Sequence, residues 1–147
     1  MAAPGYSSKS VAFYVDEASD FGNSGLEGIA YYKNDILYVG AQTGATLWAY
    51  NKNGTKIWKK QLASIAPKIQ EVGGLCYDSK NDWLWVTDSE AAKLFVFDGE
   101  ITKLLAIYPV SSVGNAESVL VDPDHGCVLV GDDGSTSKIY KYTFSGL

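Results

Sequence analysis

The chain has 147 residues, of which 46% are hydrophobic, so it is long and apolar enough to form one domain with its own core. It carries 17 acidic and 12 basic residues, for a formal net charge of −5. This charge argues against binding to the phosphate backbone of nucleic acids, which needs a basic surface. No apolar run approaches the roughly 18 residues of a transmembrane helix. Residues 1–9 lack the basic and apolar segments of a signal peptide and are expected to form a flexible arm. We therefore expect no membrane partner, and the cellular location stays open.

The first regular elements after this arm are short strands. Residues 10–15 are strand-like, and a unit that begins at Leu26 then contains four strand patterns in a row. Small residues suit the first of the four to an innermost position, and charged residues suit the last to an outermost one. Asn34 and Asp35 predict a turn after the first strand, and Asn53 with Gly54 predicts a hairpin before the fourth. The four strands are expected at residues 26–31, 36–40, 46–51 and 55–61.

The same unit is repeated twice more, at a period of about 45 residues. In the third unit the sequence ends before a fourth strand. A period of this length with several short strands per unit is typical of the blades of a β-propeller. The strands are expected at residues 73–77, 83–87, 93–97 and 101–108 in the second unit, and at residues 116–121, 127–131 and 138–143 in the third.

The repeats therefore predict an all-β half-propeller domain at residues 10–147. Its blades are expected at about residues 26–62, 71–108 and 114–147. Propellers close with about 4 to 8 blades, and an open arc of three leaves apolar faces and strand edges exposed. A second copy would close a six-bladed ring as a homodimer, with the strand at residues 10–15 of each chain completing blade three of the other. The alternative is that the chain is part of a longer six-bladed propeller; the initial methionine and the matching strand favour the dimer.

Two segments resemble the openings of blades in a known family. Residues 24–31, Ser-Gly-Leu-Glu-Gly-Ile-Ala-Tyr, and more loosely residues 114–123 resemble the blade openings of the SdiA-regulated family of six-bladed propellers. They are also similar to blades of strictosidine synthase-like, gluconolactonase-like and propeller phytase-like proteins. The resemblance implies six-bladed geometry and no particular reaction. Phytase-like enzymes hold calcium and phosphate with clustered acidic and basic residues, and this chain has part of the acidic set without a basic cluster.

Acidic residues recur at equivalent loops of the repeats. Glu27 and Glu117 lie at the start of first strands, and Asp88 and Asp132 directly follow second strands, with Glu71, Glu90 and Asp133 nearby. Loops of these two kinds open on the same face of a propeller, so we expect the four carboxylates to converge there. Oxygen ligands of this kind suit Ca²⁺. The alternative is that Asp88 and Asp132 bind turn amides and that the glutamates are solvated.

Four other residues are of types that often form sites. Trp58 lies among lysines on an outer strand and is expected to be an exposed binding residue. His125, the single histidine, lies in a turn at the opposite face, where no catalytic or metal partners are expected. Cys76 and Cys127 have neither a disulfide framework nor a metal-type spacing and are expected to be buried thiols.

Two classes of function follow. The first is a non-catalytic binding or assembly module that docks on a protein or glycan, one form of which is a structural component of a larger particle such as a virion. The second is a calcium-dependent hydrolase acting on phosphoesters or lactones. We favour the first, because one histidine and scattered carboxylates do not assemble a nucleophile, a base and an orienting group.

Overall fold

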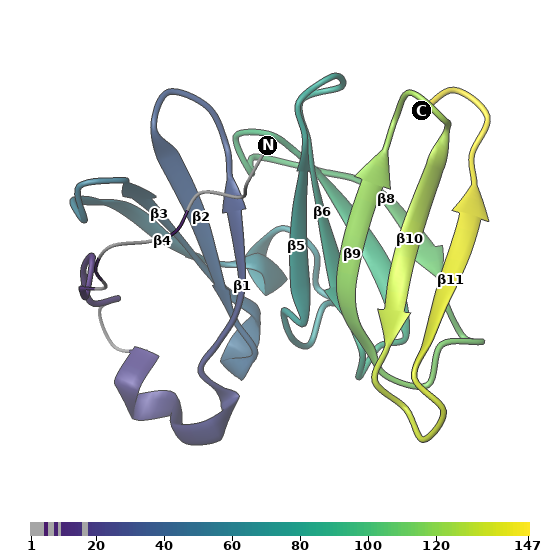
Figure 1. Cartoon of the computed structure of the whole chain (residues 1–147), viewed down its shortest axis with the longest axis horizontal. Coiled ribbons are helices and arrows are strands. Elements are labelled where there is room, and N and C mark those ends of the chain that lie inside the picture. The colour runs from purple at the N-terminus through teal and green to yellow at the C-terminus, as the bar shows by residue number, and fades with distance from the viewer. Residues whose placement is uncertain (1–4, 6–7, 9, 16–17) are drawn as a thin grey trace.

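The structure, a computed structural model, describes residues 5, 8, 10–15 and 18–147 and has three antiparallel sheets in a row (Figure 1). Each sheet follows the order of the chain, so each is a meander, and we call them blades one to three. Short 3-10 helices lie at η1 (Ala18–Ser24), η2 (Thr43–Ala45) and η3 (Leu62–Ser64). Blade one contains β1 (Leu26–Tyr31), β2 (Ile36–Ala41), β3 (Thr46–Asn51) and β4 (Lys56–Gln61); blade two contains β5 (Gly74–Asp78), β6 (Trp83–Asp88), β7 (Lys93–Asp98) and β8 (Leu104–Pro109); blade three contains β9 (Ala116–Asp122), β10 (Cys127–Asp132) and β11 (Lys138–Thr143).

The first strands of the three blades lie side by side along the inner edge of the arc (Figure 1). Glycines allow them to approach closely. A Cβ at Gly74 would lie 2.8 Å from the backbone oxygen of Glu117, and a Cβ at Gly28 would lie 2.9 Å from the side chain of Leu75. The crowding of first strands at one line is the geometry of a propeller axis.

The turn between the first and second strands has the same form in all three blades. Asp35, Asp82 and Gly126 each precede a second strand and adopt the left-handed backbone, with φ angles of 61°, 58° and 59°. Aspartate and glycine tolerate this conformation better than most residues, which explains their recurrence at this position. The repeat in the sequence is therefore a repeat in backbone conformation.

The apolar core lies in two layers between neighbouring blades. At both junctions, alternate residues of second and third strands face the following blade and the intervening ones face the preceding blade, as the pleat of a strand requires. The junction of blades one and two buries Tyr38, Leu47, Ala49, Leu84, Val86, Phe95 and Phe97, together with residues of η3 and the connection after it, Leu62, Ala66 and Ile69. The junction of blades two and three buries Trp85, Leu94, Val96, Val121, Val128 and Val130.

The structure confirms the all-β, three-blade architecture and differs from the expected strands at two places. Residues 10–15 form no strand within the single chain; they pack through Phe13 and Val15 on a face of blade one and pair with none of its strands. Ile101 is buried in a turn with a φ of 56° rather than in a strand, because the Asp98 carboxylate binds the amides of Thr102 and Lys103 and delays the start of β8. Most of the arm expected at residues 1–9 lies outside the described residues.

Within the described part of the chain, no helix is long and apolar enough to cross a membrane.

Candidate functional site

The outer face of blade one has the pattern of an interior surface. Leu37, Val39, Trp48 and Tyr50 lie on the side of the sheet that faces away from blade two. The residues at the same repeat positions in blade two are Leu84, Val86, Phe95 and Phe97, and all four are fully buried against blade one. The outer face of blade one therefore carries side chains of the type that the fold buries against a preceding blade.

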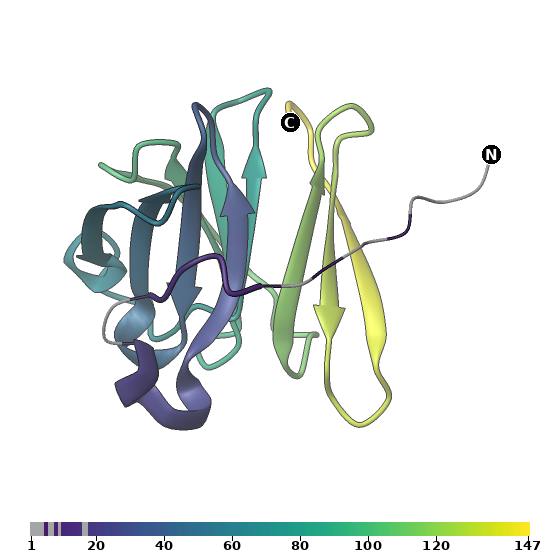
Figure 2. The ribbon, with the colours of Figure 1, turned by 60° about the vertical axis from the view of Figure 1, so that its left-hand side comes forward.

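Residues 10–15, called the arm from here on and distinct from residues 1–9, lie across this face of blade one (Figure 2). Phe13 stacks on Tyr50 with ring centroids 5.1 Å apart, and Val15 packs on the same cluster. Phe21 of η1 then covers Trp48 at 6.1 Å. As a result, Trp48 and Tyr50 are buried although no blade lies over them.

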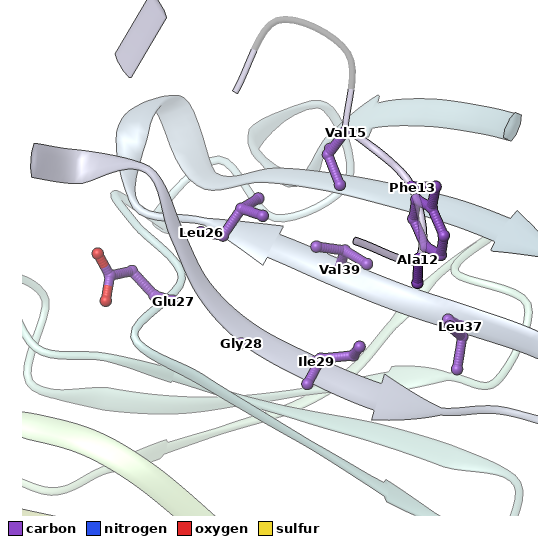
Figure 3. Close-up of a pocket in the computed structure, with 9 residues that line it drawn as sticks. All are labelled: Ala12, Phe13, Val15, Leu26, Glu27, Gly28, Ile29, Leu37 and Val39. Carbon is purple, nitrogen blue, oxygen red and sulfur yellow. The ribbon is translucent and has the colours of Figure 1, made fainter. Parts of the chain in front are cut away.

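The inner half of the face is open. Side chains of the arm, β1 and β2 surround a mainly apolar hollow of about 470 Å³, while Glu27 at its edge points away from them (Figure 3). Leu26, Ile29 and Tyr31 are 49%, 65% and 58% exposed. Exposed apolar side chains in a group of this kind mark an interaction surface.

The outer face of blade three is open as well. Leu120 and Ile139 are 56% and 77% exposed, and with Leu129 they line a shallow hollow. Leu47 and Leu94, the equivalents of Ile139 in the other blades, are completely buried against a following blade. The free face of blade three is therefore the one that packs against a following blade in the internal junctions, whereas the free face of blade one is the one that packs against a preceding blade.

Blade three also has a free strand edge. β3 and β7 pair with fourth strands, whereas β11 pairs only with β10 among the described residues. An edge of this kind offers unpaired backbone groups to another strand.

The acidic residues lie around a polar hollow beside the first strands, which we call the mouth. Glu27, Gln42, Gly73, Glu117 and Asp133 line a polar hollow of about 410 Å³. Burial and the negative charges of Glu71 and Glu27 raise the pKa of Glu117. Glu27 and Glu117 therefore line the same hollow.

The two aspartates are placed differently from the glutamates. Asp88 is fully buried, and its carboxylate accepts hydrogen bonds from the amides of Gln70 and Ala91 at 2.7 and 2.8 Å. It does not line the acidic hollow. Asp132 lines a neighbouring hollow with Glu117, and its Oδ1 accepts from the amides of Asn115 and Gly134 at 3.0 and 2.9 Å. Both aspartates bind turn amides, and their role as calcium ligands stays a prediction.

Glu71 is a structural carboxylate that the repeat pattern did not single out. It is buried, and it accepts hydrogen bonds from the amides of Ser89 and Glu90, from the Ser89 hydroxyl, and from Gln42 of blade one at 2.8 Å. Burial alone would raise its pKa, but the hydrogen bonds from Ser89 and Gln42 outweigh it, so the pKa of Glu71 lies below its ordinary value. Glu71 therefore joins blades one and two at the mouth.

Trp58 is less exposed than the sequence predicted, and its role as a binding residue stays a prediction. It is half-buried, with its ring 5.4 Å from that of Tyr38 and beneath the ammonium group of Lys60. The lysines around it in the sequence concealed that its side of β4 faces blade two. His125 lies in an exposed turn and contacts Asp122 at 2.8 Å, as a turn residue should. Cys127 is buried and Cys76 is half-buried, and burial raises the pKa of the Cys76 thiol.

In the described part of the chain, no group of three or more histidine, cysteine, aspartate or glutamate side chains is arranged to hold a metal ion. Calcium at Glu27 and Glu117 stays a hypothesis.

No protein-family model and no curated protein matches the sequence. Solved structures do match. A chain from the crystal structure of a nidogen/laminin complex aligns over 82% of this chain with a TM-score of 0.67 and 16% identity, and a luciferin-regenerating enzyme aligns over 82% with a TM-score of 0.65 and 15% identity. Both are β-propellers. This chain has the β-propeller fold.

The match is to part of each propeller. The aligned region covers 44% of the chain from the nidogen/laminin complex and 45% of the luciferin-regenerating enzyme, so this chain spans less than half the length of either. One of these proteins is in a protein complex and the other is an enzyme, and at this level of identity the likeness shows the fold alone. Membership of the SdiA-regulated family is not shown.

Proposed function

We propose that the protein is a non-catalytic binding or assembly module, in which two copies close a six-bladed ring that docks on a protein or glycan. One observation carries the proposal: the two ends of the arc expose complementary halves of a blade junction. Blade one presents the side that normally receives a preceding blade, and blade three presents the side that normally receives a following blade.

The repeat positions support a fit between the two faces. Ile139 stands where Leu47 and Leu94 stand in the internal junctions, and Leu129 stands where Tyr38 and Trp85 stand. On a second copy these side chains would meet Leu37 and Val39 of blade one, beside the open hollow. A twofold axis would bring together both pairs of faces at once and leave no end of the arc exposed. Six blades are also the number that the resemblance of the blade openings implies.

A closed ring of this kind is a rigid disc that presents loops on its two faces. Such a disc suits a docking unit, or a structural component of a larger particle such as a virion. Catalysis by histidine receives no support from the geometry, because His125 lies in an exposed turn, bound to Asp122.

Light scattering coupled to size exclusion tests the proposal, because it measures the mass of the particle in solution. We expect twice the mass of one 15.9 kDa chain. Leu120→Glu should convert the dimer to a monomer by placing a charge in the junction. Since Leu120 is 56% exposed in the single chain, the substitution should leave the fold of that chain intact.

Leu105→Glu is the matched control, since Leu105 is also an exposed leucine, 39% accessible, but lies on the outer strand β8 away from both free faces. It should remain a dimer. A stable monomer of the unmodified protein at micromolar concentration, or dissociation of both variants alike, would contradict the ring.

The acidic hollow favours a second role for the same mouth. We propose that Glu27 and Glu117 of the ring bind Ca²⁺, since clustered carboxylates and the Gln42 amide offer the oxygen ligands that this ion prefers. Bound calcium is also the feature that a calcium-dependent hydrolase would require, so the ion test in the Discussion bears on that alternative too.

A further inference from the structure

We propose that the arm is the fourth strand of blade three of the partner copy, held ready on its own blade one. The inference rests on the proposed ring, and it names the segment and the strand edge that join the two chains. Three observations support it: the vacancy beside β11, the place where the arm lies, and the alternation of its side chains.

The first observation is that, in the part of the chain that the structure describes, blade three lacks the fourth strand that blades one and two have. β4 pairs with β3 through five residue pairs from Thr46–Gln61 to Tyr50–Lys56, and β8 pairs with β7 in the same way. The edge of β11 has no partner among the described residues. A six-residue extended segment such as the arm matches the six-residue length of β4 and β8.

The second observation is where a fourth strand lies relative to the following blade. Lys60 of β4 donates to the backbone oxygen of Ile101, beyond the end of β7, at 2.7 Å. Tyr108 of β8 packs on Phe144, beyond the end of β11, with ring centroids 4.8 Å apart. In both junctions, the fourth strand of one blade therefore reaches the end of the third strand of the next.

The arm occupies the corresponding place on blade one. Phe13 stacks on Tyr50 near the end of β3, and it lies so close to the following turn that a Cβ at Gly54 would be 2.6 Å from its own Cβ. Tyr50 is the repeat equivalent of Phe97 and Tyr142, which lie next to the contacts just described. If blade three of a second copy docks on this face, its β11 edge comes beside the arm.

The third observation is the alternation of the arm. Phe13 and Val15 face blade one, while Tyr14 between them is 81% exposed. This is the pattern of a strand with one side packed against a neighbour. The single chain leaves the backbone of such a strand without a sheet.

The repeat also predicts the register. Lys60 of β4 pairs with Leu47, and Tyr108 of β8 pairs with Leu94. Leu47 and Leu94 are the equivalents of Ile139, so a fourth strand in which Phe13 takes the place of Lys60 and Tyr108 should put Phe13 opposite Ile139. An antiparallel strand then places Val11 opposite Lys141.

Disulfide trapping tests this register between chains. In a background carrying Cys76→Ala and Cys127→Ala, one batch of chains receives Val11→Cys and another receives Lys141→Cys. Both positions are exposed in the single chain, so neither substitution should disturb its fold. The two batches are refolded together under mild oxidation and resolved on a non-reducing gel. Neither chain can form an internal bond, so a cross-linked pair reports contact between copies.

We expect a covalent dimer in the mixture and little in either batch alone. Moving the second cysteine to Thr143 or Ile139 should lower the yield, since these residues are then out of register. A chain that starts at residue 16 should dimerise roughly tenfold more weakly or worse, because it loses one of the strands that the interface contains.

The outcomes separate the inference from the ring. A dimer that gives no cross-link at any of the three positions, and whose dissociation constant is unchanged when residues 1–15 are removed, overturns the strand exchange but leaves the ring. A monomeric unmodified protein overturns both.

Discussion

Phe13 and Tyr50 stack with ring centroids 5.1 Å apart and an interplanar angle of 26°, across 37 residues of sequence. Tyr50 is only 1% exposed, and its repeat equivalent Phe97 is likewise fully buried, in that case beneath a neighbouring blade. The contact therefore gives an end blade the burial that an internal blade receives from its neighbour. It also fixes the arm to the chain from which it extends.

Phe13→Ala should lower the free energy of unfolding by about 1–2 kcal/mol, less than for a fully buried phenylalanine because Phe13 is only half-buried. Urea denaturation followed by tryptophan fluorescence measures it, since Trp48 lies in the same cluster. Tyr14→Ala removes an aromatic ring from the adjacent position, where it is 81% exposed, and should change the stability little. Equal losses for the two variants would contradict the packing of the arm on blade one.

The crowded inner strands give a second prediction. Gly74→Ala would place a methyl group 2.8 Å from the backbone oxygen of Glu117, and neither strand can yield without opening the line of first strands. We expect a loss of about 1–3 kcal/mol or more, as for other overpacked sites. Gly114→Ala is the control, because its new methyl group would meet its nearest neighbour, the Asp132 carboxylate, at an ordinary 3.6 Å. Thermal melts that show the same small change for both variants would contradict this account of the axis.

The repeat made most of the fold predictable. Residues 138–143 were expected as a strand and form β11 with those bounds, because alternation and position within the repeat agree there. Ile101 was placed in a strand by its apolar side chain, but an apolar residue between a turn and a strand suits either element. Its placement depends on the Asp98 carboxylate, which holds the amides of the next turn. A local hydrogen bond of this kind leaves no trace in hydrophobic periodicity.

The candidate site was less predictable than the fold. The repeat placed Glu27 and Glu117 on one surface. Whether a carboxylate at such a loop faces solvent depends on how many backbone amides lie near it, which the repeat does not predict. Asp88 is taken up by the amides of Gln70 and Ala91, which belong to loops that the repeat does not describe. Residues 10–15 are predicted to pair with a strand of another chain. In the single chain they pack on blade one, so that pairing stays a prediction.

The raised pKa of Glu117 predicts a dependence of stability on pH. A carboxyl group whose pKa is raised by folding binds its proton more tightly in the folded state, so its contribution favours the folded state at low pH and is lost as the pH rises through the raised pKa. Glu117→Gln removes the negative charge of residue 117, which burial and the nearby charge of Glu71 destabilise in the folded state. The melting temperature of this variant should therefore exceed that of the unmodified protein at about pH 7, and the difference should shrink toward about pH 4, near the ordinary pKa of glutamate.

The control for this effect is Glu100→Gln, which removes the same charge from an exposed turn after β7. Its melting temperature should follow the unmodified protein across the same pH range. If Glu117→Gln also shows no gain at neutral pH, the negative charges at the mouth do not oppose one another as their positions suggest.

Calcium gives the last prediction, because a divalent cation would relieve the same opposition. An ion that binds only the folded state at 100 times its dissociation constant stabilises it by about 2.7 kcal/mol per site, which a melting experiment detects. Protein concentration must be held constant, since the melting of a dimer depends on it. Glu27→Gln with Glu117→Gln should abolish the calcium-dependent rise while leaving the particle mass unchanged, and Glu100→Gln should retain it. If calcium leaves the melting temperature of the unmodified protein unchanged, the glutamates are solvated rim residues and the calcium-dependent hydrolase loses its ion. The assembly role would stand in that case, because it depends on the apolar faces of blades one and three and not on the acidic mouth between them.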